Sequence, residues 1–220
     1  MTLRAEIVET ARRMTSLGLN RGSSGNISAR DGEGMLITPS GIPSEEMDET
    51  QIVAMAVDGS WEGGHRPSSE WRFHRDILAA RPETHAVVHA HPVYATALAA
   101  HGRGIGAFHY MVAAAGGVDI RCAPYATFGT QALSDHVLSA LEDRSACLMA
   151  HHGMIACGAD LASALALAVE VEGLAAQYIA ASTLGPPPEL SEEEMARVLE
   201  KFQAGYGYAS GLEAEIEPSA

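Results

Sequence analysis

The chain has 220 residues, of which 47% are hydrophobic and 19% are charged, a balance that is ordinary for a globular protein of one compact domain. Its 14 basic and 28 acidic residues give a formal net charge of -14, whereas nucleic-acid and anionic-membrane surfaces need clustered Lys and Arg. The composition therefore excludes a broad surface of either kind, and an anionic small molecule would have to bind through local dipoles and a few chosen groups.

The first part of the chain predicts one helix followed by strands. Apolar residues recur at helical spacing from Leu3 to Leu17 and stop at Gly18, which predicts an amphipathic N-terminal helix ended by a glycine. The elements expected next are a glycine-rich turn at 22–26, strands at 27–29 and 35–38, a turn at 39–41, and a strand at 52–57 that turns at Asp58-Gly59.

Helices and strands alternate in the rest of the chain. The expected elements are a helix from about 70 to 80, a strand at 86–91, helices at 93–101 and 132–142, a strand at 147–150, and a long Ala- and Leu-rich helix at 161–181 that ends near Gly185. Parallel βαβ repetition is incomplete, so the order favours a single α/β or α+β domain with a mixed sheet packed by helices. It disfavours a doubly wound nucleotide-binding fold.

The cysteines and the N-terminus indicate a cytoplasmic protein. Cys122, Cys147 and Cys157 are odd in number, widely spaced and without a C-x-x-C pair. They are typical of reduced core thiols rather than of a disulfide framework or a zinc ribbon. The first residues carry no apolar leader, and no apolar stretch is expected to approach the roughly 20 residues that span a bilayer.

The segment His89-Ala90-His91 follows the apolar run 86–88 and predicts a metal site. Alternate side chains of a strand point to one face, so both imidazoles would project together, roughly 7 Å apart along the strand. A lone histidine is usually a core or surface residue, but this pair is joined by His151-His152 and by a carboxylate candidate. Imidazole and carboxylate suit zinc best, with cobalt, manganese and iron as alternatives. The residues after His91 lack the Asp-His of a metallo-hydrolase and the Glu of a cupin strand.

Three pairs of small polar residues are candidates for an anion site. They are Gly25-Asn26, Ser40-Gly41 and Ser68-Ser69, and the last pair precedes a predicted helix whose N-terminus favours a phosphate. Residues of these types in turns are most often structural. A G-x-x-x-x-G-K-[ST] loop is absent, which argues against a nucleoside triphosphate. Glu70 follows the last pair, and its position alone leaves open whether it only complements the helix dipole.

These motifs together resemble the class II aldolase/adducin family, from about Thr10 to Tyr206. The resemblance rests on Gly18-Leu19-Asn20, Gly25-Asn26, Leu36-Ile37-Thr38-Pro39, Gly41-Ile42-Pro43, the segment from Pro67 to His74, Ala86 to His91, His109-Tyr110-Met111, Ala123 to Thr130 and His151-His152-Gly153. It implies a class II aldolase-like fold, with one domain over residues 1–210 around a mixed, largely antiparallel sheet flanked by helices. Residues 211–220 are expected to form a mobile acidic tail.

The resemblance also implies the composition of the site. One Zn2+ per subunit would be held by His89, His91 and His152, with Glu70 as a displaceable fourth ligand and general acid–base, while His151 stays outside the ligand set. The phosphate would be surrounded by Gly25, Asn26, Ser40, Gly41, Ser68 and Ser69. Tyr110 and Phe128 would reach the active site of a neighbouring subunit, so the resemblance implies a homotetramer with shared sites. A C-terminal tyrosine, Tyr206 or Tyr208, would handle the aldehyde oxygen, although Tyr206 lies about one position from the family's register.

The implied reaction is reversible cleavage of a ketose 1-phosphate, such as L-fuculose 1-phosphate, to dihydroxyacetone phosphate and a small aldehyde such as L-lactaldehyde. It would pass through a metal-stabilised enediolate, so no lysine Schiff base is needed. The alternatives are an aldolase for 5-deoxyribulose 1-phosphate or 5-methylthioribulose 1-phosphate, a sugar-phosphate 4-epimerase, and a non-catalytic adducin-like module. The epimerases carry Asp at the position of Glu70, and an adducin-like module would be expected to have lost the ligand histidines.

Overall fold

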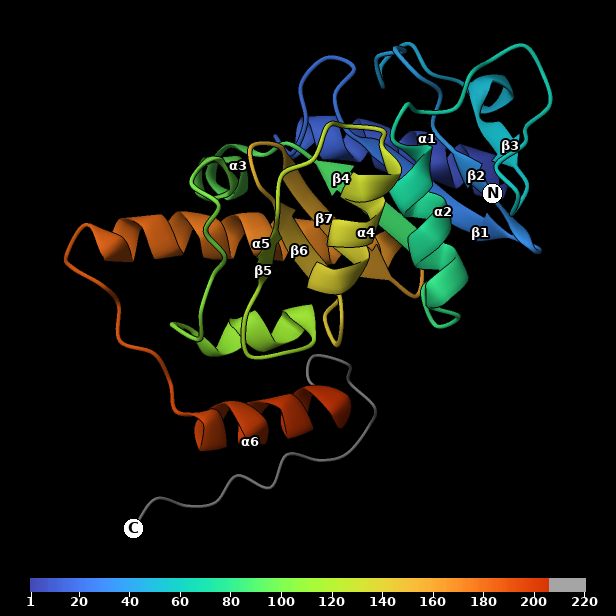
Figure 1. The fold of residues 1–220 in the computed structure, drawn as a ribbon. Coiled ribbons are helices and arrows are strands. Elements are labelled where there is room, and N and C mark those ends of the chain that lie inside the picture. The colour runs from blue at the N-terminus through green and yellow to red at the C-terminus, as the bar shows by residue number, and fades with distance from the viewer. Residues whose placement is uncertain (206–220) are drawn as a thin grey trace.

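A computed structural model describes residues 1–205 of the chain, which form helices on both faces of one mixed sheet (Figure 1). The sheet has seven strands in the order β3-β2-β1-β4-β7-β6-β5, and every neighbouring pair is antiparallel except the parallel pair β5 and β6. The predicted mixed, largely antiparallel sheet flanked by helices is therefore confirmed.

The described residues form seven strands, six α-helices and two 3-10 helices. The strands are β1 Asn26–Asp31, β2 Gly34–Ile37, β3 Val53–Met55, β4 Ala86–Ala90, β5 Arg121–Ala123, β6 Ala146–Met149 and β7 Gly153–Gly158. The α-helices are α1 Leu3–Ser16, α2 Trp71–Ala80, α3 Val93–Ala100, α4 Gln131–Ala140, α5 Leu161–Ser182 and α6 Glu192–Gln203, and the 3-10 helices are η1 Glu49–Gln51 and η2 Tyr110–Ala115.

Local sequence explains the first helix. The Thr2 hydroxyl accepts a hydrogen bond from the Ala5 amide and so caps the N-terminus of α1. After the helix, Gly18 adopts φ +75°, a left-handed conformation that glycine reaches without strain. Ile7, Val8 and other apolar residues of α1 are buried against the sheet, as the helical spacing predicts.

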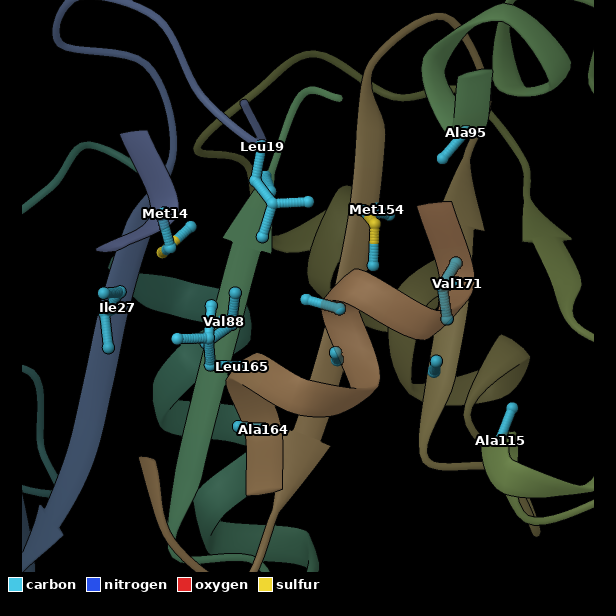
Figure 2. Close-up of a cluster of buried hydrophobic side chains, with 14 of the residues drawn as sticks. Met14, Leu19, Ile27, Val88, Ala95, Ala115, Met154, Ala164, Leu165 and Val171 are labelled. Carbon is cyan, nitrogen blue, oxygen red and sulfur yellow. The ribbon is translucent and has the colours of Figure 1, made fainter. Parts of the chain in front are cut away.

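The two faces of the sheet carry separate hydrophobic cores, and β4 contributes to both. Val88 belongs to the core shared with α1, α3 and α5, and Figure 2 shows it in one cluster with Leu165 and, farther along the sheet, Met154. Val87 belongs to the core shared with α2 and α4, which pack against each other over the opposite face (Figure 1). Because side chains alternate along a strand, His89 must point to the same face as Val87, toward α2.

Helix α5 corrects one expectation from the sequence. It has 22 residues and contains an 18-residue stretch with a mean hydropathy of 1.4, so by length and composition it is apolar enough to cross a membrane. Its buried residues, Leu165 and Val171 among them, instead pack against β4 and β7, as in a core helix (Figure 2). A long apolar helix in the core of a globular protein passes the same test of length and composition.

Several other boundaries differ from the sequence prediction. The strand expected at 52–57 ends at Met55, because Val57 and Asp58 already lie in a turn closed by hydrogen bonds to Ser60. The elements that were not predicted are β5, β7, η1, η2 and α6. Of the three cysteines, Cys147 and Cys157 are buried, and Cys122 is half-buried; burial raises the pKa of Cys157 to about 12, as fits a reduced core thiol.

Candidate metal centre

Four metal-ligating side chains meet at one end of the central strands. Glu70 directly precedes α2, His89 lies in β4, His91 follows β4, and His152 lies in the loop between β6 and β7. One ligand atom from each of these residues lies within 4.8 Å of those of the other three. The structure therefore brings together the four residues that the resemblance implied, from three separate segments of the chain.

A glycine allows this close approach. β4 pairs with β7 so that Ala90 lies opposite Met154, which places the start of β7 beside His91. A Cβ atom on Gly153 would lie 2.4 Å from the Ala90 carbonyl oxygen and 2.7 Å from the His91 ring. Only a residue without a side chain fits there, which explains sterically why glycine follows His151-His152 at position 153.

The hydrogen bonds of His89 determine which of its nitrogens is free. His89 Nδ1 lies 2.9 Å from the carbonyl oxygen of Met154, which can only accept, so Nδ1 carries the proton. In the neutral ring Nε2 then presents a lone pair. That atom lies 3.1 Å from Glu70 Oε2 and 2.8 Å from His91 Nε2. Ligand atoms of three side chains thus converge on one point, an arrangement that could hold a metal ion.

The carboxylate of Glu70 is buried and only partly satisfied by the protein. Its Oε2 accepts a hydrogen bond from Asn26 Nδ2 at 3.0 Å. Its Oε1 lies 3.0 Å from His152 Nε2 but has no hydrogen bond of acceptable geometry in the described part of the chain. A buried oxygen of this kind, aimed at a cluster of imidazoles, fits a divalent metal ion with nitrogen and oxygen ligands.

The electrostatics of the cluster agree with that assignment. Burial raises the pKa of Glu70, but the adjacent imidazoles of His89 and His152 outweigh burial and hold the pKa well below its usual value. Burial, with the nearby His89 and His152, lowers the pKa of His91 to about 3. An ionised carboxylate and a neutral imidazole are the forms that bind metals.

The three pairs of small polar residues come together beside the cluster. The Ser68 amide donates to the Thr38 carbonyl at 3.0 Å, and the Ser40 amide donates to the Arg66 carbonyl at 2.9 Å. These bonds place Ser40-Gly41 alongside Ser68-Ser69. One hollow in this region is lined by residues that include Gly25, Asn26 and Thr38. A second hollow includes Ser69, Glu70 and His91 in its wall. The hydrogen bond from Asn26 to Glu70 joins the two.

The aromatic residues of the predicted site fall in different places. Phe128 is 63% exposed and lines the second hollow in its own subunit, together with Tyr125 and His151. Tyr110 is 41% exposed, stacks on His109 in η2 and does not line that hollow. Tyr206 and Tyr208 lie outside the described residues.

Sequence reasoning assigned no role to several residues that support the cluster. His74 is fully buried one helical turn after Glu70, a spacing that could have indicated a shared helix face. Asn20 accepts a hydrogen bond from the His91 amide at 3.0 Å. His151 has φ +55°, is exposed, packs edge-on against Tyr125 and is not one of the four clustered side chains.

The sequence model of the class II aldolase and adducin N-terminal domain matches residues 5–179. The chain belongs to the class II aldolase and adducin family. It is 55% identical over 207 residues to the 5-methylthioribulose-1-phosphate/5-deoxyribulose-1-phosphate aldolase of Rhodospirillum rubrum, covering 94% of this chain and 93% of that protein. It is 53% identical to the L-fuculose phosphate aldolase of Escherichia coli, with 93% and 95% covered.

A solved structure of an L-fuculose 1-phosphate aldolase superposes with a TM-score of 0.89 at 39% identity, covering 91% of this chain and 96% of the other. These similarities extend over nearly the whole chain, and the matched proteins are aldolases. The family, the fold class and the class of enzyme predicted from the sequence, a metal-dependent class II aldolase, are therefore confirmed.

Proposed function

We propose that this class II aldolase cleaves a ketose 1-phosphate to dihydroxyacetone phosphate and a small aldehyde. The observation that carries the proposal is the convergence of His89 Nε2, His91 Nε2 and the Glu70 carboxylate on one point, beside turns suited to a phosphate. Nothing of this arrangement would be needed in a purely adducin-like interaction module.

In this proposal His89, His91 and His152 hold one Zn2+ per subunit, and Glu70 is a fourth ligand that the substrate displaces. When bound, the metal supplies Lewis-acid stabilisation of the negative charge that develops on the substrate oxygens. The hydrogen bond from His89 Nδ1 to the Met154 carbonyl fixes the ring orientation in which Nε2 faces the metal.

The substrate phosphate is proposed to lie at the turns of Gly25-Asn26, Ser40-Gly41 and Ser68-Ser69. Ser69 lies two residues before the start of α2, at a helix N-terminus where the helix dipole favours an anion. Binding the phosphate there places the reacting carbons over Glu70 and supplies alignment, which accounts for a large part of many enzymatic accelerations.

Cleavage breaks the bond between C3 and C4 of the ketose. The C4 hydroxyl loses its proton as the aldehyde carbonyl forms, and the electron pair moves toward the ketone to give an enediolate. Glu70 is proposed to deliver a proton to C3 of the enediolate, which completes dihydroxyacetone phosphate, and to remove that proton in the reverse direction; its position beside the cluster supports this general acid–base role. Tyr206 or Tyr208, outside the described residues, would exchange the proton of the aldehyde oxygen, and Tyr110 is proposed to assist from a neighbouring subunit.

A panel of ketose 1-phosphates tests which aldehyde half the enzyme accepts. L-fuculose 1-phosphate, 5-deoxyribulose 1-phosphate and 5-methylthioribulose 1-phosphate differ only at that end, and the relatives named for these substrates are 53% and 55% identical. We expect dihydroxyacetone phosphate from L-fuculose 1-phosphate; a higher kcat/KM for the methylthio or deoxy compound would assign the salvage reaction instead. Recovery of a C4 epimer without net cleavage would indicate an epimerase, and inertness toward all three would overturn the proposal.

The working unit is proposed to be a cytoplasmic homotetramer with sites at subunit interfaces. Tyr125 and Phe128 are 59% and 63% exposed in the single chain, and burial of such aromatic rings against a second copy would exclude water from the hollow beside Glu70. Sedimentation of the active enzyme should give a fourfold mass, and Phe128→Ala should weaken turnover in the assembled protein. A fully active monomer would contradict shared sites.

A further inference from the structure

A chain of buried polar side chains leads away from Glu70 Oε2, the carboxylate oxygen that also lies 3.1 Å from His89 Nε2. Asn26 Nδ2 donates to Glu70 Oε2 at 3.0 Å, and Asn26 Oδ1 lies 2.5 Å from His74 Nε2. His74 Nδ1 in turn lies 2.7 Å from Ser28 Oγ. His74 and Ser28 are fully buried, and Asn26 is 7% exposed, so solvent does not substitute for any of these partners.

The chemistry of the groups fixes the direction of every hydrogen bond in this chain. The Glu70 carboxylate can only accept, so the Asn26 NH2 group must face it, and Asn26 Oδ1 must face His74. That oxygen can only accept, so His74 carries its proton on Nε2. Nδ1 then has a lone pair and must accept from the Ser28 hydroxyl. Burial, with the nearby His89, lowers the pKa of His74 to about 3, in agreement with a neutral ring.

The position of His74 is hard to explain by packing alone. Its neighbours on α2, Phe73, Ile77 and Leu78, are apolar members of the core. An imidazole buried among such residues is costly unless both nitrogens have partners, and here both do. One partner, Asn26, touches Glu70 directly and also lines the hollow formed by the turn at 22–25.

We propose that His74 is a positioning residue, which acts through Asn26 to hold the Glu70 carboxylate in place. Without the Nε2–H donor, the Asn26 amide can rotate and turn its oxygen toward the carboxylate, which would repel Glu70 from the cluster. Asn26 is also one of the residues proposed above to surround the substrate phosphate. The Asn26 amide would thus hold the Glu70 carboxylate in place and lie beside the substrate phosphate. This positioning role rests on the proposed aldolase function.

Three substitutions at one position separate this role from packing. His74→Gln places an amide nitrogen near the position of Nε2 and keeps a donor for Asn26. His74→Asn places its amide near Nδ1, where it can bond Ser28 but not Asn26, and His74→Leu removes both bonds. The first two variants are both neutral amides, so any general penalty for replacing the ring affects them alike.

We expect His74→Gln to keep kcat within about fivefold of the wild type, whereas His74→Asn and His74→Leu should lose about 10–100-fold, the range typical of outer partners of a metal site. The loss should fall mainly on kcat, with a smaller change in KM. Equal losses in the Gln and Asn variants, or full activity in His74→Leu, would overturn the proposal.

Two further readouts do not depend on turnover. Titration of the metal-free proteins with Co2+ should give the wild-type visible spectrum in His74→Gln and an altered one in His74→Asn, because a shifted Glu70 carboxylate would no longer serve as a ligand. Nitrogen NMR of the wild type should show His74 protonated on Nε2. Protonation on Nδ1 would overturn the proposed positioning role even if no variant folds. A wild type that cleaves no ketose 1-phosphate, but shows these signatures, would refute the proposed function and leave the positioning role standing.

Discussion

Replacing Glu70 with Gln is expected to leave a folded protein that binds most of its metal. Its kcat should fall about 10²–10⁴-fold, the usual contribution of general acid–base catalysis. Three imidazoles remain in the variant, and the Gln side chain has nearly the same shape as the buried carboxylate. The amide cannot take up and release a proton at C3. The measurement is kcat for the ketose 1-phosphate identified by the panel, together with metal content per subunit.

The matched control is Glu83→Gln, the same change at an exposed carboxylate that pairs with Arg81 at 2.9 Å. Because exposed pairs contribute little, this variant should behave like the wild type. Near-normal turnover in Glu70→Gln would show that another group moves the proton. Loss of the metal in that variant would instead make Glu70 primarily a ligand.

The second large effect is expected for His91→Ala, which should lose metal affinity and, with it, cleavage. The substitution reduces three imidazoles to two. The loss in metal affinity should therefore be larger than the loss of about 10–100-fold that follows removal of a residue hydrogen-bonded to a ligand. His91 follows the strand end and is only partly enclosed, so its removal should leave the sheet intact. Metal titration and thermal unfolding of the metal-free proteins measure the two effects separately.

His151→Asn provides the comparison for that variant. His151 lies next to a proposed ligand but outside the cluster, and its φ of +55° is a conformation that Asn tolerates well. Its metal affinity should stay near the wild-type value. If His151→Asn lost as much metal as His91→Ala, the assignment of ligands within the histidine pair would be wrong.

The sequence predicts best those parts of the fold that have long periodic patterns. The apolar spacing of α1 and α5 and the buried run before His89 gave elements of the right type in the right place. β5 has only three residues, Arg121–Ala123, and forms by parallel pairing with β6, so no local alternation marks it. β7 begins at Gly153 and ends at Gly158, and glycine usually indicates turns.

Some residues of the candidate site could be predicted from local sequence, and others could not. His89 and His91 could be paired from strand geometry, because both lie on one short segment. The place of Glu70 in the cluster came from family resemblance, since a carboxylate beside a helix N-terminus also has a simpler explanation. The role proposed for His74 depends on Asn26, which is 48 residues away in sequence, and only the fold shows that contact.

Metal depletion of the wild type tests the central claim most directly. The purified enzyme is dialysed against a chelator and then titrated with Zn2+, while dihydroxyacetone phosphate release and bound metal are measured in the same samples. Cleavage should disappear on depletion and return in proportion to metal, reaching its full value at one ion per subunit, while the His91→Ala protein stays inactive. Full cleavage by a preparation shown to be free of metal would contradict the account.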